Sequence, residues 1–291
     1  MYRIFTDAAG DIDPVVVEKE NIGMIPMRYM LDEKELITTG VDTIEEVHDY
    51  YEAQRSGKLT KTTQAAPQFY VDYFMPILEA GEDVLYIALS GGLSGTFASS
   101  VTAAEELREM YPNRKVVCVD SYGATGSMGL LAECAAKNRA EGMSINDNAK
   151  WIRDNCLKIQ HWFMVDDLGY LRRGGRISAA SAVMGSALSV KPVLTILKNG
   201  TLANIDKKRG FTAGANQLVE YYKNTTVGGD GERVYVIHAD NMKAADYLTE
   251  KILEINPKAD VVKHTLTPFI GAHTGPGMCA IIHFSNEERQ K

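Results

Sequence analysis

The side chains best suited to chemistry gather in a short serine- and glycine-rich segment, residues 90–96, which reads SGGLSGT. An apolar, β-branched run over residues 83–89 precedes it and predicts a buried strand, and residues 96–110 have the periodicity of a helix. A strand, a glycine-rich turn and a helix start bring backbone N–H groups and the positive end of a helix dipole to one place. The natural ligand of such a place is an anion.

This turn lacks the features of the common phosphate loops. No Lys follows its glycines as in a Walker A loop, and the glycines are not spaced as in a dinucleotide-binding loop. Because the turn itself offers only neutral donors, we predict a single carboxylate or a single phosphate as its ligand. An ordinary strand-to-helix turn, whose glycines serve only the chain reversal, is the alternative that the segment leaves open.

Ser94, Asp240 and His273 follow one another in the chain order of α/β-hydrolase triads, which makes a serine hydrolase the second functional hypothesis. Thr96 argues against it, because it stands where the nucleophile turn of those enzymes has a second glycine and would crowd that turn. A kinase acting alone has less support, since no nucleotide loop is present and Asp166–Asp167 is more simply a helix N-cap than a metal site.

Two further polar segments offer donors for an anion. Residues 61–67 form a predicted loop in which Thr62 and Thr63 either cap the next helix or donate to a carboxylate. Residues 172–177, which read RRGGRI, predict a flexible basic loop that is either a solvated turn or an anion contact. Neither segment identifies a ligand by itself.

Composition excludes several classes of protein. The chain has 291 residues, 45% of them apolar, and a formal net charge of -7, which argues against a nucleic-acid binder. No run of about 18 apolar residues predicts a membrane span, so we do not expect an integral membrane protein. The N-terminus lacks the apolar region of a signal peptide, and we expect a cytoplasmic location. Four scattered cysteines predict buried free thiols, and no spacing predicts a metal site or a cofactor.

Strand-like and helix-like segments alternate through the first half of the chain, which predicts an α/β fold with a parallel sheet covered by helices on both faces. After about residue 158 the pattern changes. Asn199–Gly200 between two apolar runs predicts a β-hairpin, and hence a mixed sheet with helices. We therefore predict two α/β domains, residues 1–158 and residues 159–291. We also expect a helix from Ser178 to Leu188.

Several segments, taken together and in order, resemble the DegV family. The matching segments are Thr6–Asp7 with Asp11, Lys61–Gln64, Gly92–Thr96, Asp120–Ser121, Gly174–Ile177, Lys191–Leu194, His238–Asn241 and Ile270–Gly277. They cover the whole chain. The family pattern is broken at Ala8, where a Ser is usual, and at Ala65–Ala66, where Pro-Ser is usual.

That family is similar to the fatty-acid-binding subunits of bacterial fatty acid kinase. The resemblance implies a long-chain fatty acid such as palmitate, stearate or oleate in an apolar tunnel, with its carboxylate held by hydroxyls and backbone N–H groups. Such a subunit is not itself an enzyme; it presents the acid to a separate kinase, which forms the acyl phosphate. Carried over by motif, the ligand-binding residues are Thr62, Ser94, Thr63, Gly95, His273 and Arg176.

The physical chemistry of lipid binding agrees with this arrangement. Each methylene moved from water into an apolar tunnel contributes about 0.8 kcal/mol, so the tail would supply the affinity. The polar end has only to satisfy a desolvated carboxylate, which is costly when it is left unpaired.

Overall fold

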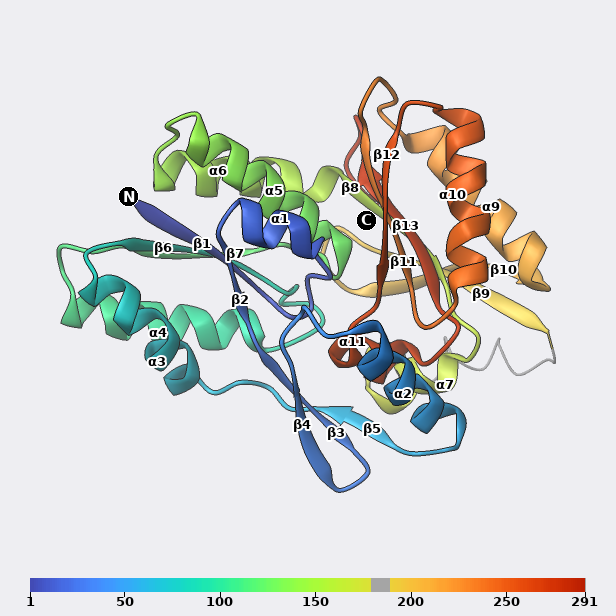
Figure 1. The fold of residues 1–291 in the computed structure, drawn as a ribbon, viewed down its shortest axis with the longest axis horizontal. Helices are drawn as coiled ribbons and strands as arrows, with labels where there is room; N and C mark the ends of the chain where they lie inside the picture. The colour runs from blue at the N-terminus through green and yellow to red at the C-terminus, as the bar shows by residue number, and fades with distance from the viewer. Residues whose placement is uncertain (179–188, 291) are drawn as a thin grey trace.

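The computed structural model describes residues 1–178 and 189–290, in which three sheets combine with helices (Figure 1). The first sheet contains four strands in the order β2 (Ile22–Ile25), β1 (Tyr2–Asp7), β6 (Asp83–Ala88) and β7 (Val116–Asp120). Every neighbouring pair in it is parallel, which confirms the predicted parallel sheet. The helix expected from Ser178 to Leu188 lies outside the described residues but for its first position.

Helices cover both faces of this first sheet. The helices of this half are α1 (Pro14–Lys19), α2 (Ile44–Arg55), α3 (Pro67–Glu79), α4 (Thr96–Met110), α5 (Gly126–Ala140) and α6 (Ile145–Asn155). In β6, Val84 and Tyr86 belong to the apolar cluster that also contains residues of α3 and α4. Leu85 and Ile87 belong to the cluster that contains residues of α5 and α6. A strand that is apolar at successive positions is typical of a parallel sheet buried on both faces.

The second sheet is mixed, as predicted. Its strands follow the order β10 (Leu202–Arg209), β9 (Val190–Ile196), β8 (Ile159–Met164), β13 (Cys279–Phe284), β11 (Arg233–His238) and β12 (Asp260–Thr265). Only β11 and β12 are parallel among its neighbouring strands. The predicted hairpin is confirmed, since β9 and β10 pair antiparallel on either side of Asn199–Gly200. α9 (Phe211–Thr225) and α10 (Met242–Ile255) pack on one face of this sheet (Figure 1).

A third, small sheet was not predicted. It joins β4 (Lys34–Thr38), β3 (Met27–Leu31) and β5 (Thr60–Thr62) by antiparallel pairing. β5 lies at the start of the segment that the sequence analysis expected to be loop. Its three residues are too few to show a periodic pattern, and Thr62 is held by a partner, Tyr29, that is far away in the sequence.

Two short helices, α7 (Leu168–Arg173) and α11 (Pro268–Thr274), pack against one another, and a 3-10 turn, η1 (Cys156–Lys158), precedes β8. Asp167 caps α7, because its Oδ1 accepts the N–H of Gly169 at 2.7 Å. The prediction of a flexible loop from residue 172 is wrong for Arg172 and Arg173, which form the last turn of α7.

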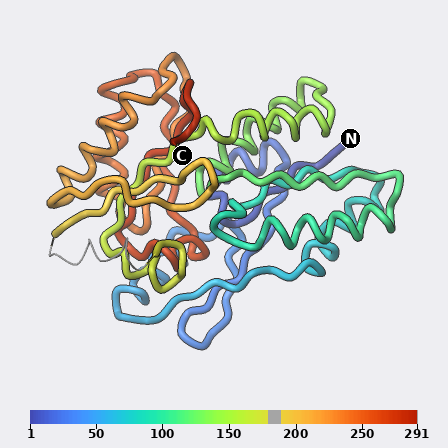
Figure 2. Tube along the Cα trace, turned by 180° about the vertical axis from the view of Figure 1, so that it is seen from behind, coloured from blue at the N-terminus to red at the C-terminus, as the bar shows by residue number. Residues whose placement is uncertain are grey.

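The two halves share one apolar core. Among the described residues, each sheet takes its strands from one side of residue 158. Nevertheless, Leu131 of α5 and Ile282 of β13 belong to a single buried cluster. Seen from behind, the β9–β10 hairpin reaches toward the first half (Figure 2), and the Ser90 hydroxyl donates to the Gly200 carbonyl at 2.9 Å.

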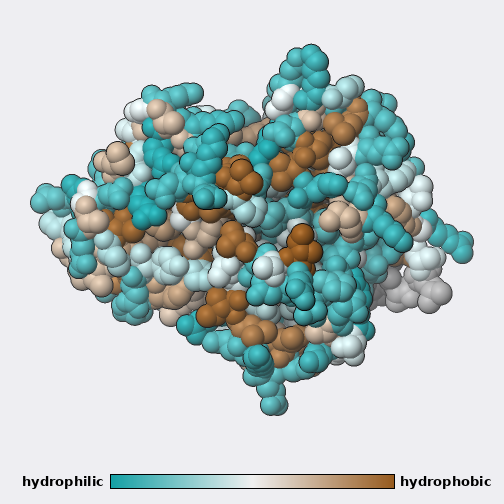
Figure 3. Space-filling view, viewed as in Figure 1, coloured by the Kyte–Doolittle hydropathy of each residue, from teal (hydrophilic) through white to brown (hydrophobic). Residues whose placement is uncertain are grey.

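The surface contrasts with this core. The face shown in Figure 3 is mainly hydrophilic, with its hydrophobic residues in separate small patches. Within the described ranges no helix has both the length and the apolar character needed to cross a bilayer. The four cysteines form no disulfide, and Cys156 and Cys279 are buried.

Candidate functional site

A cavity of about 670 Å³, including its open mouth, lies where the two halves meet. The lining is mainly apolar and combines residues of the first half (Thr62, Leu89, Leu93, Ser94, Ala124, Thr125) with residues of the second (His161, Phe163, Leu171, Arg176, Ile196, Leu202, Phe269, Ile270, His273, Thr274, Met278, Ala280, Ile282).

Four of the six predicted ligand-binding residues line this cavity: Thr62, Ser94, Arg176 and His273. They come from β5, the β6–α4 turn, the turn after α7, and α11, so the fold brings together four segments that are far apart in the sequence. Thr62, Ser94 and Arg176 are only partly buried, which places this polar group near the outside of the cavity.

Thr62 and His273 form one unit within that group. The Thr62 hydroxyl and His273 Nε2 are 2.8 Å apart. His273 Nδ1 is buried and has no partner among the described residues. Burial, with a smaller contribution from the charge of Arg176, lowers the pKa of His273 to about 4, so the imidazole is neutral at neutral pH.

Ser94 lies two residues before the first residue of α4, the helix start that the sequence analysis proposed as an anion site. Its hydroxyl is 2.8 Å from the Thr96 hydroxyl and also accepts the Thr96 N–H at 3.3 Å. The N-cap residue of α4 is Gly95, so Ser94 is tied to the first turn only through Thr96, and one of its lone pairs or its proton is still available to a ligand.

Arg176 changes the electrostatics that the turn alone predicted. Its Nε donates to the Leu93 carbonyl at 2.9 Å, and its NH1 donates to the Gly174 carbonyl. These bonds hold the guanidinium beside the serine- and glycine-rich turn. The expectation of a site with only neutral donors was drawn from that turn, and it is corrected by a cation that a separate segment supplies. Burial lowers the pKa of Arg176, which nevertheless stays charged at neutral pH.

Two predicted ligand-binding residues do not line the cavity. Thr63 is exposed and lines a separate surface hollow together with Arg28 and Gln64. Gly95 lies against Gln64, whose amide would be 2.3 Å from a Cβ at residue 95. Gln64 in turn donates to the Ser99 hydroxyl at 2.9 Å, which ties the Thr62–Gln64 segment to α4. Their direct roles in ligand binding stay predictions.

The turn also has fewer free amides than expected. The N–H groups of residues 91–94 donate to Asp120 Oδ2, Ser90 Oγ and the Ser90 carbonyl, at 3.0–3.1 Å. The Thr96 amide is used by Ser94. Within the described part of the chain, Gly95 is the residue of this turn whose N–H has no recorded acceptor, so side-chain donors dominate the site.

The hydrolase triad is not assembled. Ser94 and His273 are each hydrogen-bonded to a threonine and not to one another. Asp240 lies elsewhere and pairs with His48 Nδ1 at 3.1 Å and with Arg55. Among the described residues no hydrogen bond joins Ser94 to a base, the contact by which hydrolases activate a nucleophilic serine.

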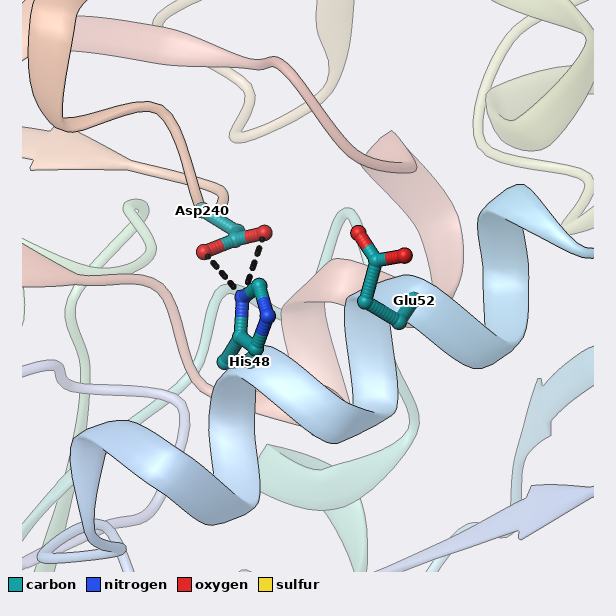
Figure 4. A group of neighbouring side chains, drawn as sticks. All are labelled: His48, Glu52 and Asp240. Carbon is teal, nitrogen blue, oxygen red and sulfur yellow. Dashed lines mark hydrogen bonds and ion pairs between the residues drawn. The ribbon is translucent and has the colours of Figure 1, made fainter.

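That distant ion pair is part of the one possible metal-binding cluster among the described residues. His48 and Glu52 project from α2 toward Asp240, which follows β11 (Figure 4). Arg55 forms salt bridges with both carboxylates, so its guanidinium already occupies the position of a cation. The cluster joins α2 to the second half of the chain.

The acidic motif residues of the first strand have a structural place. Asp7 is fully buried, accepts the Tyr86 hydroxyl at 2.6 Å, and has a pKa raised to about 6 by burial. Asp11 accepts the Thr267 N–H at 2.8 Å, and burial raises its pKa to about 8. Neither lines the cavity, and Asp11 fixes the loop that leads into α11.

The sequence analysis missed the rest of the cavity wall. Phe163 of β8 and Ala280 and Ile282 of β13 line it, and so does His161. Successive residues of a strand point to opposite faces of the sheet. Phe163, Ala280 and Ile282 therefore face the first half of the chain, whereas Trp162 and Ile281 face α9. Nothing local shows which face borders a hollow.

Comparison with known proteins agrees with this geometry. Residues 1–286 match the family described as "Uncharacterised protein, DegV family". A DegV domain-containing protein of Clostridium perfringens is 34% identical over 280 residues, 96% of each chain.

Two solved structures are similar over nearly all of the chain. A DegV lipid-binding protein of Thermotoga maritima has a TM-score of 0.84 and 26% identity, covering 99% of this chain and 100% of its own. DegV of Bacillus subtilis, described as a fatty acid binding protein, has a TM-score of 0.83 and 28% identity, covering 98% and 99%. The fold, the ordered motifs and the family match agree: this chain belongs to the DegV family.

Proposed function

We propose that this chain binds one long-chain fatty acid in the cavity between its two halves. The carboxylate is held by Thr62, Ser94 and Arg176, and the acyl chain follows the apolar wall. The observation that carries the proposal is one cavity that has donors and a cation at its partly exposed end and mainly apolar side chains along the rest. The structural relatives of Thermotoga maritima and Bacillus subtilis, described as lipid-binding and fatty acid binding, support it.

The tautomer of His273 decides what Thr62 offers a ligand. Buried N–H groups without an acceptor are rarer than buried acceptors without a donor. His273 therefore carries its proton on Nε2 and donates to the Thr62 oxygen, leaving Nδ1 as the unpaired acceptor. The Thr62 proton is then free to point at the carboxylate, and the imidazole polarises that hydroxyl.

The two ends of the ligand are bound by different interactions, the carboxylate by charge and hydrogen bonds and the acyl chain by burial of apolar surface. Arg176 and the hydroxyls favour the ionised acid, because hydrogen bonds and a nearby cation stabilise the charged form. The apolar wall supplies most of the affinity, at about 0.8 kcal/mol for each buried methylene.

We further propose that the protein is a non-catalytic subunit that works in the cytoplasm and presents the bound acid to a separate kinase. The carboxylate oxygen would attack the γ-phosphoryl group of ATP on the kinase, giving the acyl phosphate and ADP. The partial exposure of Thr62, Ser94 and Arg176 supports this, because the reacting end of the ligand lies near the surface. The unpaired cysteines are consistent with a reducing compartment.

Native mass spectrometry of delipidated protein tests the binding step. Added palmitate, stearate or oleate is expected to bind with one molecule per chain, whereas acetate is expected not to bind. Protein that takes up none of the three acids, and carries no lipid when purified, would contradict the proposal.

The transfer step has its own test. With ATP and oleate alone, the protein is expected to form no acyl phosphate, measured as the hydroxamate trapped by hydroxylamine; adding the kinase component of a fatty acid kinase is expected to produce it. Charge reversal at the exposed Arg172, Arg173 or Lys207 is expected to reduce that rate while oleate binding is unchanged. Equal rates of acyl phosphate formation in mutant and wild type would show that these cations do not contact the kinase.

A further inference from the structure

His161 is a polar side chain in an otherwise apolar stretch of the cavity wall. It lies on β8, lines the cavity, and is 3% exposed. Neither of its buried ring nitrogens makes a hydrogen bond of good geometry to a described residue, although the backbone of Ile159 and of Ala124 lies near enough to act against the lowering of its pKa. Leaving such groups unpaired is costly, and a buried polar group in a native protein normally has a protein, water or ligand partner.

The position of His161 separates it from the carboxylate site. Along β8 it is three residues before Met164, which is about 10 Å of strand, and the chain reaches α7 and Arg176 only after that strand ends. Across the sheet it pairs with Ile282, whereas the loop that leads back to His273 joins the other end of β13. His161 therefore lies on a different part of the cavity wall from Arg176 and His273, where the acyl chain of the proposed ligand would run.

The protonation state of His161 suits an uncharged partner. Burial is the main cause that lowers its pKa well below the usual value, and the charge of Arg289 acts in the same direction. A neutral imidazole has one N–H donor and one acceptor nitrogen. Such a pair matches a hydroxyl group, which donates one hydrogen bond and accepts others.

The segment beside His161 adds a second polar group and an unusual backbone. Gly123 lies against the ring, since a Cβ there would be 3.1 Å from His161 Nε2. Two residues on, Thr125 lines the same cavity with φ of 59°, a rare conformation for a β-branched residue. Its amide is held by the Ala9 carbonyl at 2.7 Å. Strain of this kind persists where the surroundings impose it, often at ligand sites.

We propose that the inner wall of the cavity, at His161 and Thr125, binds an oxygen carried by the acyl chain, so that this protein selects fatty acids hydroxylated along the chain. The inference rests on the proposed function and deepens it. A hydroxyl at the right carbon pairs with His161, whereas a plain hydrocarbon chain leaves both ring nitrogens unpaired. A site built to pair with a hydroxyl discriminates strongly against the analogue that lacks it.

The test uses delipidated wild-type protein and a series of ligands. Dissociation constants are measured for stearic acid and for stearic acids that carry one hydroxyl at successive carbons. Binding is expected to be tightest for one narrow range of positions in the inner part of the chain, about fivefold to 150-fold tighter than for stearic acid. A hydroxyl beside the carboxylate is expected to give no such gain, because that end is held by Thr62 and Arg176.

Two variants identify the residue responsible. His161→Leu is expected to abolish the preference for the hydroxylated chain and to bind stearic acid at least as tightly as wild type. His161→Asn keeps a donor and an acceptor and is expected to retain part of the preference. The control His283→Asn changes another buried neutral histidine, which faces Thr225 and not the cavity, and is expected to leave the preference unchanged.

The outcomes separate this inference from the proposed function. If stearic acid binds as tightly as every hydroxylated acid, the inference is wrong while fatty-acid binding stands; an ordered water would then satisfy His161. If neither kind of acid binds, the proposed function itself fails. The same ligand preference in His161→Leu and in wild type would also overturn the assignment.

Discussion

The hydroxyl of Thr62 and Nε2 of His273 lie 2.8 Å apart, although 211 positions separate the two residues in the sequence. β5 and α11 meet at this contact. Because His273 holds the Thr62 hydroxyl in place, this hydroxyl of an edge strand is a donor with a fixed position at the cavity. The histidine cannot move away without leaving a second buried nitrogen unpaired, since its Nδ1 already lacks a partner within the described residues.

Thr62→Val is expected to weaken oleate binding by about 1–3 kcal/mol, because it removes a donor from a buried anion and leaves His273 unpaired. Titration calorimetry with delipidated protein measures the change. Thr63→Val is the matched control, because Thr63 is exposed and outside the cavity. Equal losses in the two variants would show that the effect does not arise at the carboxylate.

Arg176→Gln is expected to weaken binding of oleate more than binding of oleyl alcohol, since only the acid gains from the cation. The ratio of the two dissociation constants is the measurement. Arg173→Gln serves as a control, because that guanidinium stacks on the Tyr170 ring at 4.4 Å and does not line the cavity. If Arg176→Gln leaves this ratio unchanged, Arg176 does not bind the carboxylate, and the hydroxyl groups alone hold it.

The buried carboxyl of Asp11 is expected to make stability depend on pH. Its pKa rises on folding from 3.8 to about 8, so the folded state binds this proton more tightly than the unfolded chain. The stability that it contributes is complete below about pH 4 and is lost as the pH rises through about 8. Asp11→Asn does not titrate. Its free energy of unfolding, relative to wild type in urea titrations, is therefore expected to rise across that range, and a constant difference would contradict the shift.

Gly92→Ala is expected to destabilise the protein by about 1–3 kcal/mol, a usual cost of overpacking. The new Cβ would lie 2.7 Å from the Asn199 carbonyl oxygen, and this backbone cannot rotate away. In Gly91→Ala the closest atom is Asp120 Oδ2, at the end of a side chain, so a smaller loss of stability is expected there. Urea unfolding of both variants measures the difference, and a larger loss in Gly91→Ala would argue against close packing of the hairpin on the turn.

The sequence predicted those helices and strands that are encoded by patterns among neighbouring residues. β6, the turn after it and α4 are recognisable because apolar runs and helical periodicity are properties of neighbouring residues. The small sheet was missed for the opposite reason. β5 has three residues, and its pairing of Tyr29 with Thr62 depends on chain segments that the sequence does not show to be adjacent.

The site divides in the same way. The resemblance supplied four residues that do line the cavity, but the spacing of Thr62, Arg176 and His273 would not have joined them. The turn alone suggested free amides and neutral donors. Hydrogen bonds within the turn use most of the amides, and Arg176, which lies just after α7, adds a cation. His161 was overlooked because a single histidine in an apolar strand forms no recognisable motif. What marks it in the structure is the lack of hydrogen-bond partners for its buried ring nitrogens, which the sequence does not show.

The four-segment origin of the polar group has a consequence for biosynthesis. A ribosome releases Thr62, Ser94 and Arg176 before it releases α11, so the group of four side chains is complete only after His273 has been made. A nascent protein can complete its first sheet yet cannot hold an acid at this place. Retention of lipid would then report that α11 has been made, and a fragment cut before residue 268 is expected to emerge empty.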